Sequence, residues 1–204
     1  MPRTTLIREV RFAVKGRKDH IPKLRVIKGG LTDETSVGPL RIVAAPTKAP
    51  PFEVDAFAFE EDTFLVLSAD TQVRDPKIPL TRIMTRLIDT KPATPGTVLV
   101  RGRRPLRFLA IVHDLNQEPS WKEEWIMHAL SRIFQAAESR ELQALALQML
   151  GTVHGSLEKR RFIFLLRTAI EGAFFHHLKR LWLIVPHGTA REIIAMLESQ
   201  QYPI

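Results

Sequence analysis

The chain has 204 residues, of which 45% are hydrophobic and 25% are charged, and it contains no cysteine. This composition is ordinary for a globular protein of one domain with an elaboration, and the absence of cysteine excludes disulfides, thiolate metal sites and a cysteine nucleophile. Charges interrupt every apolar run near the N-terminus, and no run approaches the roughly 18 residues that span a bilayer. We therefore expect a cytoplasmic protein that makes no membrane contact.

The positive charge is concentrated at one end of the chain. The formal net charge is +8, and residues 1–50 hold 11 Lys/Arg against 4 Asp/Glu, whereas residues 51–204 hold 19 against 18. Such asymmetry can mark a surface for a polyanion, but it is also typical of the solvated face of edge strands, which is the interpretation we favour. Because the chain has one Tyr and three Trp, we expect nucleic-acid binding to be at most weak and non-specific.

The first quarter of the chain is predicted to be rich in β-structure. Apolar and charged residues alternate over 5–14 and 23–29, which is the period-two pattern of half-buried strands. Residues 30–38 (GLTDETSVG) are predicted to form a loop and 39–45 (PLRIVAA) a further strand. Three prolines in 46–53 make a stiff connection, which we interpret as the end of a basic elaboration.

Strands and a helix are predicted next. Residues 62–69 (DTFLVLSA) are apolar enough for a buried strand, and 78–89 carries an apolar helical face. Strands are also predicted over 97–101 (TVLVR) and 106–112 (LRFLAIV). The connection VRGRRPLR at 100–107 could bind phosphates through bidentate guanidinium contacts, although a solvated turn is the favoured interpretation.

A long amphipathic helix is predicted over about 120–138. Ser120 and Glu123 have the spacing of a capping box at its start. An apolar residue recurs every three or four positions, so one stripe of the helix is expected to be buried. The stripe consists of Trp125, Ile126, Ala129, Leu130, Ile133, Phe134 and Ala137.

The last third of the chain continues the alternation of strands and helices. Residues 142–150 (LQALALQML) are predicted to be a strand or an extension of the preceding helix, followed by a helix over about 156–176. Residues 179–185 (KRLWLIV) form the last predicted strand, and Thr189 and Glu192 suggest a capping box for a final helix. Strands and helices alternating at this spacing predict an α/β protein with a largely buried central sheet.

The stretch from about residue 95 to 197 resembles a macro domain. PGTVLV followed by PLRFLAIVHDL, the glycine-containing segment LALQMLGTVHGSLEKRRFIFLLRTAIE, and LKRLWLIVPHGTAREIIAMLE follow the order and spacing of that family over about half the chain. The resemblance implies a three-layer α/β/α sandwich with a mixed central sheet and, in ordinary members, ADP-ribose binding. The N-terminal domain of leucine aminopeptidases has a similar architecture. We accordingly divide the chain into a basic β-rich N-terminal extension, 1–50, and a macro-like domain, 51–204.

The chain departs from the family pattern at the ligand loops. SADTQV at 68–73 stands where the family has an Asn-rich loop, and the glycines that normally follow are missing. Members that remove ADP-ribose depend on those positions. The resemblance therefore implies no hydrolysis here, and we predict no catalytic residue and no cofactor.

The best candidate site is the loop GTVHGS at 151–156. Glycines allow backbone N–H groups to converge, and the start of a helix adds free N–H groups and a partial positive charge, which together suit a phosphate. Glu158 counts against anion binding, and the alternative is a strand-to-helix turn in which the glycines serve geometry only. The candidate ligand-binding residues are Gly151, Thr152, Val153, His154, Gly155 and Ser156, and a possible second wall consists of Ser68, Asp70, His113, Asp114, Pro186 and His187.

These sequence features are compatible with two functions. One is a binding module for ADP-ribose or a related nucleotide or phosphate ligand, which would use the loop at 151–156. The other is a non-catalytic scaffold with a degenerate ligand site, a basic N-terminal surface and possible homo-oligomer contacts. His113 ends a predicted strand, where an acid/base role and a structural role are both possible. His176 and His177 lack a third ligand, so we predict no metal site.

Overall fold

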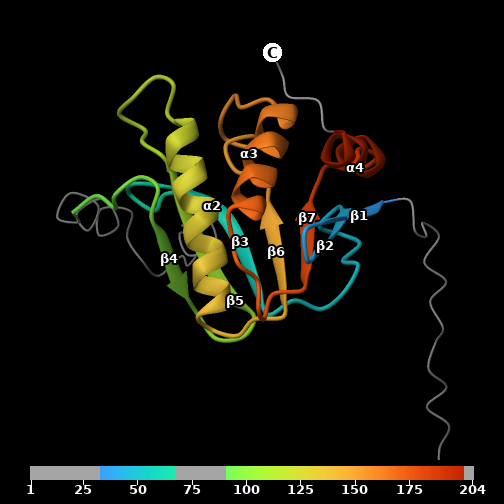
Figure 1. Cartoon of the computed structure of the whole chain (residues 1–204). Helices are drawn as coiled ribbons and strands as arrows, with labels where there is room; N and C mark the ends of the chain where they lie inside the picture. Colours follow the sequence, from blue (N-terminus) through green and yellow to red (C-terminus); the bar gives the residue numbers. More distant parts are fainter. Residues whose placement is uncertain (1–32, 68–90, 200–204) are drawn as a thin grey trace, which may run out of the picture.

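The computed structural model describes residues 33–67 and 91–199. The predicted strands at 5–14 and 23–29 and the predicted helix at 78–89 lie outside these ranges. Within the described residues the chain forms an α/β sandwich, as predicted, in which helices pack on a mixed sheet (Figure 1).

Seven strands form one sheet in the described part of the chain, in the order β1-β2-β7-β6-β3-β5-β4. Strands β2, β7, β6, β3 and β5 run parallel, and the edge strands β1 and β4 are antiparallel to their neighbours. The carboxyl ends of five strands therefore meet at one edge, where open α/β sheets bind ligands. The strands are β1 (Glu34–Val37), β2 (Leu40–Ala45), β3 (Ala56–Asp62), β4 (Val98–Arg101), β5 (Leu106–His113), β6 (Ala144–Gln148) and β7 (Arg180–Ile184).

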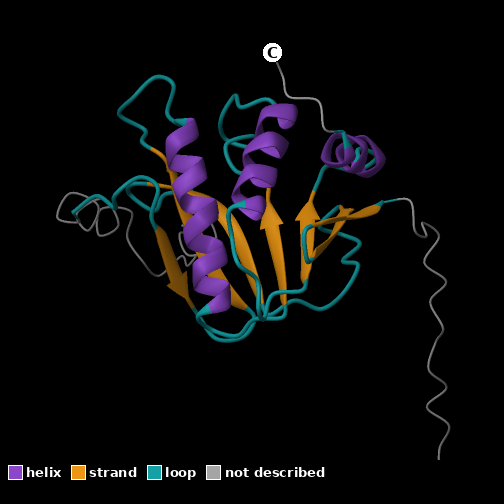
Figure 2. Ribbon diagram, in the orientation of Figure 1, coloured by secondary structure: helices purple, strands orange, loops and turns teal. Residues whose placement is uncertain are grey.

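Within the described residues, three helices cover one face of this sheet, as Figure 2 shows. They are α2 (Glu123–Glu138), α3 (Lys159–Glu171) and α4 (Ala190–Glu198). Each turns an apolar stripe toward the strands, because its hydrophobic residues recur every three or four positions. The buried stripe of α2 is the predicted one, except that Trp125 is only half-buried.

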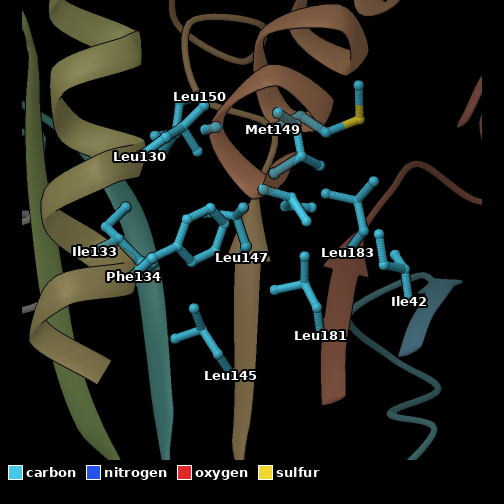
Figure 3. Packing of buried hydrophobic residues seen from close by; sticks show 14 of the residues in the cluster. Ile42, Leu130, Ile133, Phe134, Leu145, Leu147, Met149, Leu150, Leu181 and Leu183 are labelled. Atoms are coloured by element: carbon cyan, nitrogen blue, oxygen red, sulfur yellow. The ribbon is translucent and has the colours of Figure 1, made fainter. Parts of the chain in front are cut away.

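The core lies between the helices and the sheet (Figure 3). Successive strand side chains point to opposite faces, so Leu145 and Leu147 of β6 pack toward Phe134 of α2, whereas Ala146 points away. Full burial of a side chain such as Phe134 contributes about 1.5–3 kcal/mol. On the opposite face a smaller apolar cluster surrounds Trp182.

Most strands lie where the sequence predicts them. The apolar patterns at 39–45, 97–101, 106–112 and 179–185 correspond to β2, β4, β5 and β7. The segment 142–150, for which both a strand and a helix extension were predicted, contains strand β6. Helix α2 ends before it, at Glu138.

Two predictions about strands are wrong. The segment 30–38, predicted to be a loop, contains β1, and β3 occupies 56–62 instead of the predicted 62–69. Asp62 accounts for the second error. Its buried carboxylate accepts hydrogen bonds from the backbone N–H groups of Phe64, Val66 and Leu67 at 2.7–2.9 Å, so the chain turns where the strand was expected to begin.

The predicted capping boxes are also wrong. The N-cap of α2 is Lys122, whose side chain makes no capping hydrogen bond. The predicted capping residue, Ser120, lies two residues earlier, and its hydroxyl contacts His113. Thr189 does occupy the N-cap of α4, but its hydroxyl donates to the Pro186 carbonyl. Helix α3 begins at Lys159, three residues after the predicted start at about residue 156.

Strands β1 and β2 belong to the same sheet as the rest of the described chain. Strand β2 pairs in parallel with β7, from Arg41 opposite Arg180 to Ala45 opposite Ile184. Residues 34–45 thus lie inside the sandwich, although the sequence analysis places them in the extension. The boundary at residue 50 itself stays a prediction.

Candidate functional site

A cleft of about 590 Å³ opens at the carboxyl edge of the sheet, between the ends of β2, β6 and β7 and the start of α3. Its volume lies within the range of small-molecule sites, roughly 300–1,000 Å³. The lining combines an apolar floor with a few polar groups. The lining residues are Thr47, Gln148, Met149, Thr152, Val153, Leu157, Glu158, Lys159, Ile184, Val185 and Pro186.

The glycine loop forms one wall of this cleft through Thr152 and Val153. Gly151 has a φ of +77°, a left-handed conformation that favours glycine, and a Cβ there would also lie 2.7 Å from Ile126 Cδ1. Gly155 is needed for a different reason. A Cβ at this position would collide with the carbonyl oxygen of Gly151 and approach Trp121 Cδ1 to 2.7 Å.

A buried carboxylate lies directly beneath the loop. Glu60 lies near the carboxyl end of β3, and its side chain is fully buried. Its Oε2 accepts the backbone N–H of Gly151, and its Oε1 accepts the backbone N–H of His154, both at 2.6 Å. The Nδ1 of the His154 ring is also 2.6 Å from Oε1. Two of the N–H groups expected to converge on a phosphate therefore converge on the protein's own carboxylate.

His113 completes the buried polar cluster. Its Nε2 lies 3.7 Å from Glu60 Oε2, its Nδ1 lies 3.1 Å from the Ser120 hydroxyl, and the residue is 1% exposed. The distance from Nε2 to the carboxylate is too long for a hydrogen bond, and this buried nitrogen has no hydrogen-bond partner among the described residues. Burial raises the pKa of Glu60, but contacts with His113 and His154 outweigh it and hold that pKa below its ordinary value. Glu60 is therefore ionised at neutral pH.

The start of α3 supplies positive charge to the cleft. Its N-cap, Glu158, makes no side-chain cap, and the first turn carries Lys159, Arg160 and Arg161 without an acidic residue. Arg161 is bound by Glu123 through two hydrogen bonds of 2.7 Å, which lower the pKa of Glu123. Lys159 lines the cleft, whereas Arg160 is exposed beside it.

The remaining predicted site residues have varied surroundings. Pro186 lines the cleft, and His187 follows it as an exposed residue outside the lining. Asp114 accepts hydrogen bonds from the side chains of Asn116 and Gln117 within its own turn. Ser156 accepts a hydrogen bond from Trp121 Nε1 at 3.3 Å. Ser68 and Asp70 lie outside the described residues.

Sequence reasoning missed Glu60 and Trp121. Acidic residues are seldom buried, and Glu60 was not considered as a site residue, although it is buried together with Glu61 and Asp62. The available signal was the alternation AFAFE, which places Glu60 on the same face of the strand as Ala56 and Ala58. Among residues 33–67 and 91–199, no group of three potential ligands could hold a metal ion, and no helix is long and apolar enough to cross a membrane.

Comparison with known proteins identifies the fold. No family model matches the sequence, and neither does any curated protein. Solved macrodomains do match the structure. The Oceanobacillus iheyensis macrodomain with ADP is 10% identical, with a TM-score of 0.59 over 80% of this chain and 93% of that one. The Thermus aquaticus DarG macrodomain is 15% identical, with a TM-score of 0.52 over 71% and 98%. The chain therefore has a divergent macrodomain-like fold.

Proposed function

We propose that this protein is a divergent macro-like binding module for ADP-ribose or a related nucleotide, which it takes into the cleft at the carboxyl edge of the sheet. The observation that carries the proposal is the position of that cleft. The cleft is lined on one side by Thr152 and Val153 of the glycine loop and on another by Lys159 of the basic first turn of α3. Structural neighbours from Oceanobacillus iheyensis were solved with ADPR and with ADP, which supports this class of ligand.

The lining suits a nucleotide with one flat apolar part and one anionic part. Met149, Ile184 and Val185 provide an apolar floor, and Lys159 with the free N–H groups of the helix start provides an anion subsite. Because Glu60 already binds the N–H groups of Gly151 and His154, we place the phosphates toward Lys159. Glu158 restricts the ligands that the cleft can bind. Its carboxylate lines the same cleft and disfavours a ligand with several phosphates.

A second candidate is a non-catalytic scaffold with a degenerate ligand site. The observation that favours it is again Glu60, because a loop that binds its own carboxylate has fewer N–H groups for a ligand. The two functions differ in whether the cleft binds any nucleotide at all.

Calorimetric titration with ADP-ribose, ADP and adenosine distinguishes them. For a binding module, we expect ADP-ribose to bind and Lys159→Ala to weaken it by at least about tenfold, or about 1.4 kcal/mol. Arg160→Ala is the matched control, because it removes a neighbouring charge that does not line the cleft. No binding of any of the three ligands to the folded parent would exclude the module, and equal losses in both variants would exclude a contact from Lys159.

A further inference from the structure

The sheet face opposite the three helices carries arginines that neither the core nor the cleft uses. Side chains alternate along a strand, and Phe108 of β5 lies in the core beneath the helices, so Arg107 points to the opposite face. Arg180 has the same orientation, because it lies two residues before Trp182 in the cluster on that face.

Strand register brings these arginines together in pairs. Arg101 of β4 lies directly opposite Arg107 of β5, and Arg41 of β2 lies directly opposite Arg180 of β7. All four are exposed, and we call them the arginine row. They span six neighbouring strands of the sheet, which at a spacing of about 4.8 Å corresponds to roughly 24 Å.

This arrangement places like charges side by side. Like charges directly opposite on neighbouring strands destabilise a sheet. Glu34 forms an ion pair with Arg41, but within the described ranges no carboxylate forms one with Arg101, Arg107 or Arg180. Three of the four arginines in the row thus lack a carboxylate partner within the described ranges, and most of the positive charge of the row is uncompensated.

Aromatic rings contact two of the four guanidinium groups, and Phe57 and Phe59 belong to β3, which lies between the two pairs. The rings of Phe57 and Phe59 stack at 5.9 Å, and the guanidinium of Arg107 lies 5.8 Å from the Phe59 ring. That of Arg180 lies 4.9 Å from the Phe52 ring. A guanidinium that lies over a ring still has N–H groups at its edge, which can bind a phosphate in bidentate fashion.

We propose that the arginine row binds the phosphate backbone of a single nucleic-acid strand. One isolated phosphate could engage one pair, but a row of about 24 Å matches an anion that repeats along its length. The half-buried rings between the pairs can support bases without reading them. Arg103, exposed in the turn between β4 and β5, extends the charge at one end, whereas the neighbouring Arg104 lies 4.0 Å from the carboxylate of Asp55. Binding here is independent of the nucleotide cleft, which opens at the carboxyl edge.

Fluorescence anisotropy with a labelled single strand of about twelve nucleotides tests this proposal. The full chain should bind at about 50 mM salt and release the strand as salt rises, with about −0.7 in the log–log slope for each phosphate contact. Arg101→Ala combined with Arg107→Ala should weaken binding at least about tenfold and reduce the slope by about 1.4. Arg160→Ala combined with Arg191→Ala, which removes two exposed charges from α3 and α4, should stay within about threefold.

Thermal unfolding separates loss of binding from loss of structure. The Arg101/Arg107 double variant should unfold close to the temperature of the parent, because the loss of a like-charge pair offsets the loss of the contact between Arg107 and the Phe59 ring. Equal weakening in both double variants would show an effect of overall charge and overturn the proposal. So would failure of the parent to bind at low salt, or an Arg101/Arg107-dependent attachment to phosphatidylserine vesicles without binding to the strand.

Discussion

The carboxylate of Glu60 accepts the backbone N–H of Gly151 at 2.6 Å across 91 positions of sequence. This bond joins the end of β3 to the loop after β6, and the neighbouring bond to His154 joins the same carboxylate to the middle of that loop. A loop that would otherwise need a bound anion to hold its N–H groups together is thus held by a residue of the chain.

Glu60→Ala should destabilise the protein markedly. The change leaves the backbone N–H groups of Gly151 and His154 without their acceptor and removes the carboxylate that faces the buried His113 ring at 3.7 Å. Hydrogen bonds to charged groups contribute about 1.5–3 kcal/mol. We expect a loss of at least about 2 kcal/mol in the free energy of unfolding, measured by urea denaturation. Glu53→Ala, at an exposed position, should change it by less than about 0.5 kcal/mol. Equal effects at the two positions would contradict the role given to Glu60.

The same group predicts a direction for acid denaturation. The pKa of Glu60 is lowered in the folded protein from its ordinary value of 4.5. Its contribution to stability is therefore complete above 4.5 and is lost as the pH falls through the folded-state pKa. Denaturation curves collected from neutral pH downward should show the parent losing stability below about pH 4.5. Glu60→Gln should be less stable than the parent at neutral pH and should lose less unfolding free energy as the pH falls below about 4.5. Parallel curves for the two proteins would contradict the role of Glu60 in acid denaturation.

Gly155→Ala should be more damaging than Gly102→Ala. At Gly155 the added Cβ meets the Gly151 carbonyl and the Trp121 ring, whereas at Gly102 it meets nothing within 4 Å. Overpacking costs about 1–3 kcal/mol, and the positive φ of 79° at Gly102 costs about 1–2 kcal/mol. We expect the loss of unfolding free energy in Gly155→Ala, measured by urea denaturation, to lie at the top of the first range. A smaller loss at Gly155 than at Gly102 would show that the loop shifts easily.

The fold was more predictable than the site, for a physical reason. Strands such as β5 and β7 are buried and apolar, and their patterns depend only on neighbouring residues. The site depends on Glu60, whose partners Gly151 and His154 come from a segment far along the chain. The loop and its glycines could be located from the sequence, but the close approach of the Gly151 carbonyl and the Trp121 ring to Gly155 could not. No local sequence pattern predicts that a side chain of β3 will bind the backbone of the loop after the neighbouring strand β6.

The pairing of β2 with β7 has a consequence for how the chain folds during synthesis. Strand β2 ends at Ala45, and its parallel partner ends at Ile184. At a translation rate of about 5–20 residues per second, β2 waits on the order of 7–30 s before that partner has been made. During this interval Ile42 and Val43 belong to an apolar strand whose pairing on that side is missing, which is the kind of edge that associates with other chains. Strands β1 and β2 are thus synthesised before the other strands of the described sheet, but the pairing of β2 with β7 can form only after those strands have been made.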